Sequence, residues 1–361
     1  MGFIRFLLAV GVVLCHTSSI YGFSPVSGNT AVQCFYIISG FYMTMILNEK
    51  YTGQNGNKIF YLNRALKIYP IYWIILFASI IWSLTVYKFG YPGVAKQYAD
   101  NSPLSLATWS YLILSNIFII GLDWIFLFKL ENGNMLFTTD FNAQKPAFYT
   151  FAFNSIAWTV GLELLFYLIA PFIMRKNILW IVMMLLLSLG LRLLLNENGL
   201  NHVPWDYMFF PTQILFFMLG GLSYYLYKKV KLSGKINFII SAAYAIVIIF
   251  YYQFFPNNFI KEVFLFVFTA LAIPSLFNLT AKSKIDKYLG DLSYPIYISQ
   301  SLIIMVTGAK IFPKPFGWGL TAVILCIAAG IFLTYFVTRP IEKIRQKKIN
   351  MINDYAITSS K

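Results

Sequence analysis

Long apolar stretches alternate with short polar segments along almost the whole chain. A helix needs about 20 mostly apolar residues to cross a bilayer, and stretches near this length recur from the first residues onward. We therefore expect an all-α integral membrane protein in which residues 1–348 form one multi-span domain and residues 349–361 form a polar cytoplasmic tail. The pattern predicts about ten transmembrane helices, at residues 4–22, 30–48, 69–89, 154–174, 178–196, 207–227, 236–254, 259–278, 291–309 and 317–337.

One more apolar stretch, residues 111–128, is long enough to cross but contains Asp123. If this stretch crossed the membrane, the basic residues before it and those after it would lie on opposite sides. We therefore expect it to form an interfacial or re-entrant helix within a long external segment, residues 90–150.

Composition excludes a soluble protein, because 59% of the residues are hydrophobic and only 11% are charged, against about a quarter charged in soluble domains. The net charge is +15, and the basic residues gather after alternate spans. This asymmetry places both termini in the cytoplasm and does not resemble a nucleic-acid-binding surface. The clusters lie at residues 50–67, 175–176, 228–235, 282–287 and 339–348.

Polar side chains in several spans come to a similar depth. His16 follows Arg5 by eleven residues, which places it about 16 Å deeper and within about 20° of the same helix face. Glu163 precedes Arg175 by twelve residues, or about 18 Å. Intramembrane ionisable residues are functional candidates, so a pocket near mid-membrane is predicted. The same estimate brings Ser39, Tyr297 and Gln300 to this layer.

Such a pocket suits acid–base chemistry. His16 can take a proton from an alcohol while a carboxylate, Glu163, orients its ring; His202 lies in an external turn. Arg5, Arg64 and Lys67 form a positive cytoplasmic entrance for a phosphate-bearing ligand. No metal-binding spacing and no nucleotide motif is present. Simpler interpretations stay open: Glu163 as a helix contact, Arg64 and Lys67 as membrane anchors, and Ser39 as a small packing residue.

Five segments resemble acyltransferase family 3, the membrane proteins that O-acylate bacterial surface and exported polysaccharides. They follow the family's order, although Lys67 replaces an arginine, Thr159 a serine and Gln300 a second histidine of many members. The segments are IRFLLAVGVVLCH at residues 4–16, FYIISGFYMT at residues 35–44, NRALKIYP at residues 63–70, WTVGLELLFYLIAP at residues 158–171 and LGDLSYPIYISQ at residues 289–300.

The resemblance implies an enzyme of the bacterial cytoplasmic (inner) membrane with no bound cofactor or metal. It implies acyl-CoA, most often acetyl-CoA, as co-substrate and a glycan or lipid-linked oligosaccharide as acceptor. It also implies contact with membrane lipids and with polysaccharide export or polymerisation proteins, and no nucleic acid. His16 would act as the base or carry the acyl group itself, with Glu163 beside it. Side chains for the acceptor or the oxyanion would be Ser39, Ser293, Tyr294, Tyr297 and Gln300.

Two other functions remain possible from the sequence. A flippase or transporter is expected to show paired repeat halves, which this chain lacks. A polysaccharide polymerase would not require basic residues aligned with a buried histidine. Loss of glycan acetylation with the polymer intact would separate the acyltransferase from both.

Overall fold

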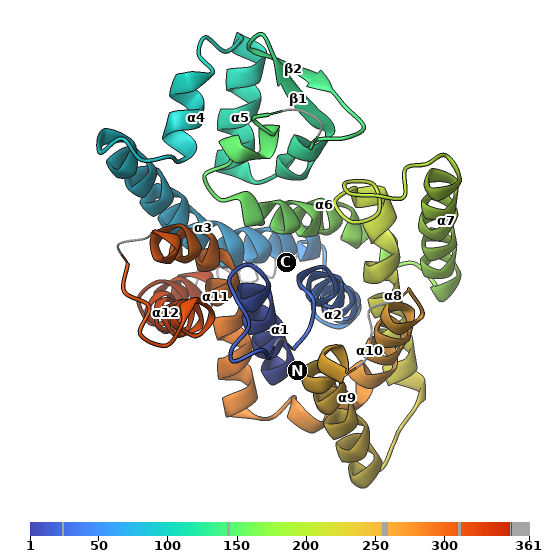
Figure 1. Cartoon of the computed structure of the whole chain (residues 1–361). Helices are drawn as coiled ribbons and strands as arrows, with labels where there is room; N and C mark the ends of the chain where they lie inside the picture. The colour runs from blue at the N-terminus through green and yellow to red at the C-terminus, as the bar shows by residue number, and fades with distance from the viewer. Residues whose placement is uncertain (24, 143–144, 255–258, 310–311, 347, 349–361) are drawn as a thin grey trace. The chain divides into compact units, whose positions relative to one another are not determined.

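The computed structural model describes the chain except residues 24, 143–144, 255–258, 310–311, 347 and 349–361 (Figure 1). The predicted tail at residues 349–361 therefore lies outside the described residues. Helices dominate, as predicted. The α-helices are α1 (Gly2–Cys15), α2 (Gly28–Glu49), α3 (Gly56–Lys88), α4 (Val94–Asp100), α5 (Leu106–Phe118), α6 (Trp158–Ile173), α7 (Ile178–Glu197), α8 (Phe210–Lys229), α9 (Gly234–Phe254), α10 (Phe259–Thr280), α11 (Lys284–Gly308) and α12 (Trp318–Leu333).

Shorter elements complete the described chain. A hairpin of two antiparallel strands, β1 (Phe128–Glu131) and β2 (Asn134–Phe137), follows the 3₁₀ helix η1 (Leu122–Leu127). Two more 3₁₀ helices, η2 (Phe148–Phe151) and η3 (Ser155–Ala157), precede α6, and a π-helical turn, η4 (Thr334–Thr338), follows α12.

Within the described residues, six helices are long and apolar enough to cross a membrane. The protein is therefore a multi-pass membrane protein, while the predicted count of about ten spans stays a prediction. The six lie at Gly28–Glu49, Gly56–Lys88, Ser155–Ile173, Ile178–Glu197, Ile260–Thr280 and Trp318–Gln346.

Two predicted boundaries are wrong. The first helix does not reach residue 22, because α1 ends at Cys15 and the backbone turns at Tyr21 and Gly22, which have φ of 50° and 84°. The third helix begins well before the predicted residue 69, because the segment at residues 63–70 belongs to α3, which starts at Gly56 and continues through Pro70. Phe60 and Ile68 are buried, so packing of this face offsets the hydrogen bond that a proline inside a helix removes.

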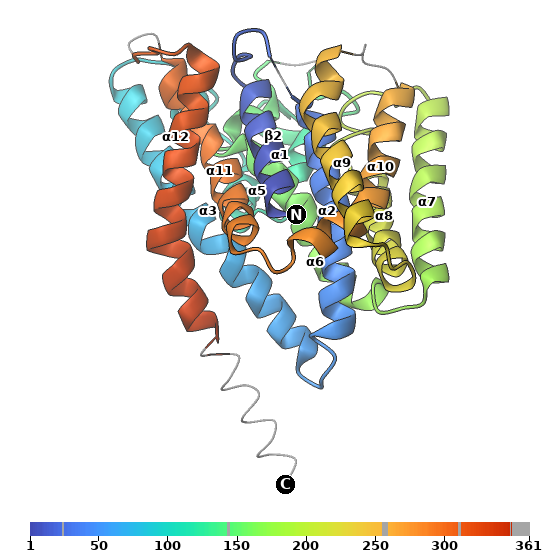
Figure 2. The same ribbon diagram turned by 90° about the horizontal axis from the view of Figure 1, so that it is seen from below.

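The chain forms two compact units. The first comprises residues 1–71, 167–185 and 215–361, and the second comprises residues 72–166 and 186–214. In the first unit α1 packs against α2, α11 and α12, and α9 packs along α10 (Figures 1 and 2). The core between α1, α11 and α12 is built from small and branched side chains, including Val13, Ile296 and Cys326.

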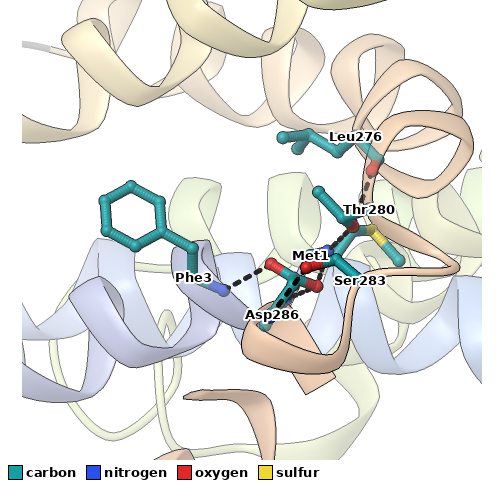
Figure 3. Close-up of polar contacts among 7 residues, drawn as sticks. Met1, Phe3, Leu276, Thr280, Ser283 and Asp286 are labelled. Atoms are coloured by element: carbon teal, nitrogen blue, oxygen red, sulfur yellow. Dashed lines mark hydrogen bonds and ion pairs between the residues drawn. The ribbon is translucent and has the colours of Figure 1, made fainter. Parts of the chain in front are cut away.

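An aspartate of α11 fixes the start of α1 (Figure 3). Asp286 accepts hydrogen bonds from the backbone N–H groups of Gly2 and Phe3, at 2.7 and 2.9 Å, and forms an ion pair of 2.7 Å with the amine of Met1. The first turn of α1 contains no acidic residue. Asp286 thus supplies the negative charge that a helix N-terminus favours.

Two glycines bring α2 and α8 into direct backbone contact. A Cβ atom on Gly40 would collide with the carbonyl of Phe217, and one on Gly220 would collide with the carbonyl of Ile37. Small residues allow this approach between membrane helices, where dispersion contacts rather than the hydrophobic effect hold the helices together. Gly40 is therefore a packing position, and its close contact with α8 fixes the position of the neighbouring Ser39.

Arg175 holds the connection between α2 and α3. Its guanidinium donates to the carbonyls of Leu47 and Tyr51, at 3.3 and 2.5 Å, and to Oδ1 of Asn57 at 2.6 Å. The sequence predicted only a cytoplasmic charge here. The side chain instead closes the α2–α3 turn.

In the second unit, the apolar stretch at residues 111–128 does not form one continuous helix. After α5 the chain reverses at Ile119 and Gly121, whose φ values are 65° and 80°, and it returns through η1 and β1. At the other end of α5, the carbonyl of Gly133 accepts hydrogen bonds from the N–H of Ser105 (2.9 Å) and the hydroxyl of Thr108 (3.0 Å). The segment thus turns back on itself, and its interfacial or re-entrant position stays a prediction.

The tip of this segment is held by side chains of α3 and by α6. The hydroxyl of Tyr72 donates to the carbonyl of Asn116, and the indole N–H of Trp73 donates to that of Ile117 at 2.9 Å. A Cβ atom on Gly161 of α6 would lie only 3.0 Å from the carbonyl oxygen of Ile119. These contacts satisfy or shield carbonyls at the end of α5, as buried backbone carbonyls require.

Candidate functional site

Arg5 and His16 lie on α1 as the sequence predicted. Arg5 is half-buried in the second turn, and His16 is the C-cap residue in a right-handed helical conformation (φ −93°, ψ 0°). The helical spacing between Arg5 and His16 is therefore maintained up to the C-cap. His16 is exposed, and within the described chain its imidazole makes no hydrogen bond. Its ring nitrogens are available to a substrate.

The first turns of α11 lie beside Arg5. A Cβ atom on Gly290 would stand 4.0 Å from Nη1 of Arg5, so the guanidinium passes along this glycine. Ser293 is buried one turn later, and its hydroxyl donates to the carbonyl of Gly290 at 2.7 Å. The hydroxyl of Tyr294 donates to the carbonyl of Ile68 on α3 at 2.9 Å. Tyr294 thus joins two helices, a role the sequence did not indicate.

The inner face of α11 continues with Tyr297 and Gln300. The Tyr297 ring meets the ring of Phe35 on α2 edge-on, with centroids 6.1 Å apart. Gln300 is completely buried, and neither its amide nitrogen nor its amide oxygen has a hydrogen-bond partner within the described residues. Leaving a buried polar group unpartnered costs about 1–3 kcal/mol. Gln300 therefore has both a donor and an acceptor to offer a bound molecule.

A tyrosine of α6 connects two more predicted residues. The hydroxyl of Tyr167 lies 3.4 Å from Oγ of Ser39 on α2, and either oxygen can donate. The guanidinium carbon of Arg64 lies over the Tyr167 ring, 5.6 Å from its centroid, and over the Phe60 ring at 5.9 Å. Nε of Arg64 is buried without a partner in the described chain. The stacked guanidinium is held in place with hydrogen-bonding capacity left over.

Tyr167 is a site residue that sequence reasoning missed. It belongs to the segment at residues 158–171, but a tyrosine in an apolar helix is more often a core residue. Its two partners lie more than 100 positions away in the chain, so only the fold reveals the grouping.

Two other predicted residues, Lys67 and Glu163, have not been linked to this group by a contact described above. Lys67 is half-buried on α3, one turn after Arg64, and makes contacts of its own. Glu163 is half-buried on α6 and also has an interaction partner. Glu163 belongs to the second unit and His16 to the first. Their pairing stays a prediction.

Asp123 is a further residue whose environment the sequence did not indicate. It is 3% exposed in η1, and its Oδ1 has no hydrogen-bond partner among the described residues. Burial raises the pKa of this carboxyl to about 7, although a hydrogen bond from its own backbone N–H opposes the rise. In the sequence, an acidic residue inside an apolar stretch indicated only that this stretch does not cross the membrane.

A search of the described residues for three or more clustered His, Cys, Asp or Glu side chains finds no group that could hold a metal ion. The first unit instead gathers two guanidinium groups, several hydroxyls and one unpartnered amide around α11 and Tyr167. This arrangement can bind an anion and can place hydrogen-bond donors beside a reacting carbonyl.

Comparison with known proteins agrees with this chemistry. Neither the curated proteins nor the solved structures include a match to this chain. The family model described as an acyltransferase domain, that of acyltransferase family 3, matches residues 1–339. Because this match covers the chain from α1 to the end of η4, the protein belongs to acyltransferase family 3 and is a membrane acyltransferase.

Proposed function

We propose that this protein moves an acyl group, acetyl in the first instance, from cytoplasmic acyl-CoA to a sugar hydroxyl. The acceptor is an exported or surface polysaccharide, or its lipid-linked precursor, at the bacterial cytoplasmic membrane. The observation that carries the proposal is the arrangement around α11. Arg5 passes along its first turns, α3 with Arg64 is tied to it through Tyr294, and the unpartnered Gln300 lies further along it.

The basic residues suit the donor. CoA carries phosphate groups, which guanidinium and ammonium groups bind through charge-assisted hydrogen bonds. Arg64 is already positioned by the Phe60 and Tyr167 rings and keeps a free Nε. Arg5 and Lys67 would contact the same phosphates, and the pantetheine arm would extend along α1 toward His16.

In the direct route, His16 takes the proton of the sugar hydroxyl while the hydroxyl oxygen attacks the thioester carbonyl carbon. The tetrahedral oxyanion then re-forms the carbonyl, the carbon–sulfur bond breaks, and the proton passes from His16 to the CoA thiolate. In the alternative route, an imidazole nitrogen of His16 attacks the thioester carbonyl carbon and CoA leaves as its thiolate; the sugar hydroxyl then attacks the acyl-imidazole, the carbon–nitrogen bond breaks, and the hydroxyl proton passes to the released imidazole. Glu163 would orient the imidazole in both routes.

The oxyanion needs donors that are fixed before the reaction begins. Gln300 is suited to this role because its amide N–H groups are buried and unpartnered. Unlike the histidine of many family members at this position, glutamine cannot accept a catalytic proton. The chemistry therefore depends on a single histidine. Tyr297, Ser293 and Ser39 would complete the polar lining around the sugar.

The first test compares the two histidines of the chain. A strain carrying His16→Ala should lose the acyl groups of its surface or secreted glycan while polymer amount and chain length persist. The matched variant, His202→Ala, should retain acylation. Mass spectrometry and NMR of the purified glycan provide the measurement. Loss of the polymer itself in the His16 strain would favour a polymerase or flippase and overturn the proposal.

A second test addresses the donor. Replacing Arg64 with lysine keeps the charge but removes the planar fork and its stacking, so KM for acyl-CoA should rise about tenfold, with a smaller change in kcat. Lys58→Gln, at an exposed position near the start of the same helix, should leave both constants unchanged. An unaltered KM for Arg64→Lys would exclude Arg64 from donor binding.

A further inference from the structure

An apolar cavity lies in the first unit, away from the residues assigned to the reaction. It has a volume of about 170 Å³, is open on one side, and is lined by the starts of α1, α9 and α11 and the end of α10. On α9 the lining positions are Phe238, Ser241, Ala242 and Ala245, which share one face of the helix. Three of these four side chains are small. The cavity exists because no large side chain fills this face.

One polar atom inside this wall has no partner. Ser241 is only 5% exposed, and its hydroxyl forms no hydrogen bond to any residue that the structure describes. A serine inside a helix normally returns its proton to the carbonyl one turn earlier, as Thr280 does to Leu276 at 2.8 Å. The Ser241 hydroxyl therefore remains available to accept or donate a hydrogen bond within the cavity.

The surroundings of the cavity are positively charged and face the cytoplasmic ends of the helices. Lys235 precedes Phe238 by one turn on α9, and Lys282 and Lys284 lie between the lining residues Thr280 and Asp286. All three lysines are exposed. The nearby carboxylate of Asp286 is neutralised by the Met1 amine and by backbone N–H groups of α1 (Figure 3).

We propose that this cavity binds one acyl chain of an anionic glycerophospholipid from the cytoplasmic leaflet. Part of the chain occupies the apolar space, the ester carbonyl accepts a hydrogen bond from Ser241, and the phosphate lies among the three lysines. Ser241 follows Lys235 by six residues, or about 9 Å along the helix, so both groups lie toward the same end of α9. Basic pockets between membrane helices on the cytoplasmic side bind anionic headgroups in this way.

A lipid at this position would contact α1 directly. Met1 and Ile4 line the cavity, and Asp286, at its edge, holds the first backbone N–H groups of the same helix. The bound chain would therefore support the helix that carries Arg5. The binding itself does not depend on acyl transfer, so it can be tested without any knowledge of the enzyme's substrates.

The test uses the full-length protein in nanodiscs of dioleoylphosphatidylcholine with a small fraction of dioleoylphosphatidylglycerol, followed by native mass spectrometry of the released protein. We expect retained phosphatidylglycerol to exceed phosphatidylcholine at least about tenfold after correction for abundance, since each surface lysine contributes about a fivefold preference. Ala242→Leu, which fills the cavity, should abolish this retention. Ala243→Leu, on the same helix but outside the lining, should leave it unchanged.

Two further variants separate the parts of the proposal. Ser241→Ala should lower retention about fivefold, the usual effect of one lost hydrogen bond. Lys235→Gln combined with Lys282→Gln and Lys284→Gln should remove the preference for phosphatidylglycerol. His16→Ala should retain the lipid fully, so failure of the acyl-transfer proposal would not affect this result. Equal retention of the two lipids, retention unchanged in Ala242→Leu, or displacement of the lipid by acyl-CoA would overturn the proposal.

Discussion

Replacement of Asp123 by asparagine should remove a large pH-dependent contribution to the stability of the protein. The folded state holds this carboxyl with a pKa of about 7 because it is buried, whereas an unfolded aspartate titrates near 4. Between these values the folded state binds more protons than the unfolded state. Stability therefore falls as pH rises from about 4 to 7, and the loss is complete above pH 7.

The size of the effect follows from the two pKa values. One pKa unit corresponds to about 1.4 kcal/mol, so ionised Asp123 disfavours the folded state by about 4 kcal/mol at pH 8. About 2 to 3 kcal/mol of this accrues between pH 5 and pH 8. For a chain of this size, 1 kcal/mol corresponds to about 2 °C in Tm. The wild-type Tm should thus fall by about 4 to 6 °C over that range.

The assay is thermal unfolding of the detergent-solubilised protein, followed by intrinsic fluorescence at pH 5, 6, 7 and 8. Because asparagine cannot ionise, Asp123→Asn should exceed the wild-type Tm by about 3 °C at pH 5 and by about 8 °C at pH 8. Asp100→Asn, at an exposed aspartate of α4, serves as the control and should retain the wild-type slope. A wild-type Tm that is constant over this range, or a slope that persists in Asp123→Asn, would refute the reasoning.

Three other substitutions give distinct outcomes. Gly220→Val should destabilise the protein by more than about 3 kcal/mol, because the branched side chain would collide with the Ile37 carbonyl and force α2 and α8 apart. The fraction of folded protein that survives heating measures this loss of stability. Tyr167→Phe should lower kcat several-fold with Tm unchanged within about 2 °C, since it removes only the hydroxyl beside Ser39; an equal loss in Tm would indicate a structural role instead. Arg175→Lys should cost about 2 kcal/mol in unfolding free energy, because the compact ammonium cannot reach the three separate acceptors that Nε, Nη1 and Nη2 of the guanidinium contact.

The helical, multi-span character was predictable because apolar stretches near 20 residues are a strong signal. The placement of Arg5 and His16 on one helix was also predictable, since the register of a single regular helix depends only on the residue count. The end of that helix was predicted too late. The polar run from His16 to Ser19 interrupts the apolar pattern, but the predicted span extended through it to residue 22.

Other features depend on contacts between distant parts of the chain. The third span was predicted to begin at residue 69, but α3 begins at Gly56 and stays helical through Pro70, with Phe60 and Ile68 buried. The grouping of Ser39, Tyr167 and Arg64 arises from three separate helices. The resemblance assigned the hydroxyl of Tyr294 to the reaction, but in the structure this hydroxyl donates a hydrogen bond to the Ile68 carbonyl. Sequence spacing alone cannot distinguish these uses.

The direct backbone contact between α2 and α8 has a consequence for motion during turnover. With Gly40 against Phe217 and Gly220 against Ile37, neither helix can slide or rotate alone, since no side chain lies between them to change its rotamer. Ser39 is therefore a fixed point within the first unit. A rearrangement that admits a substrate beside Ser39 therefore has to involve neighbouring side chains. The rings of Tyr167 and Phe35 can rotate about their side-chain torsions while α2 and α8 stay in place.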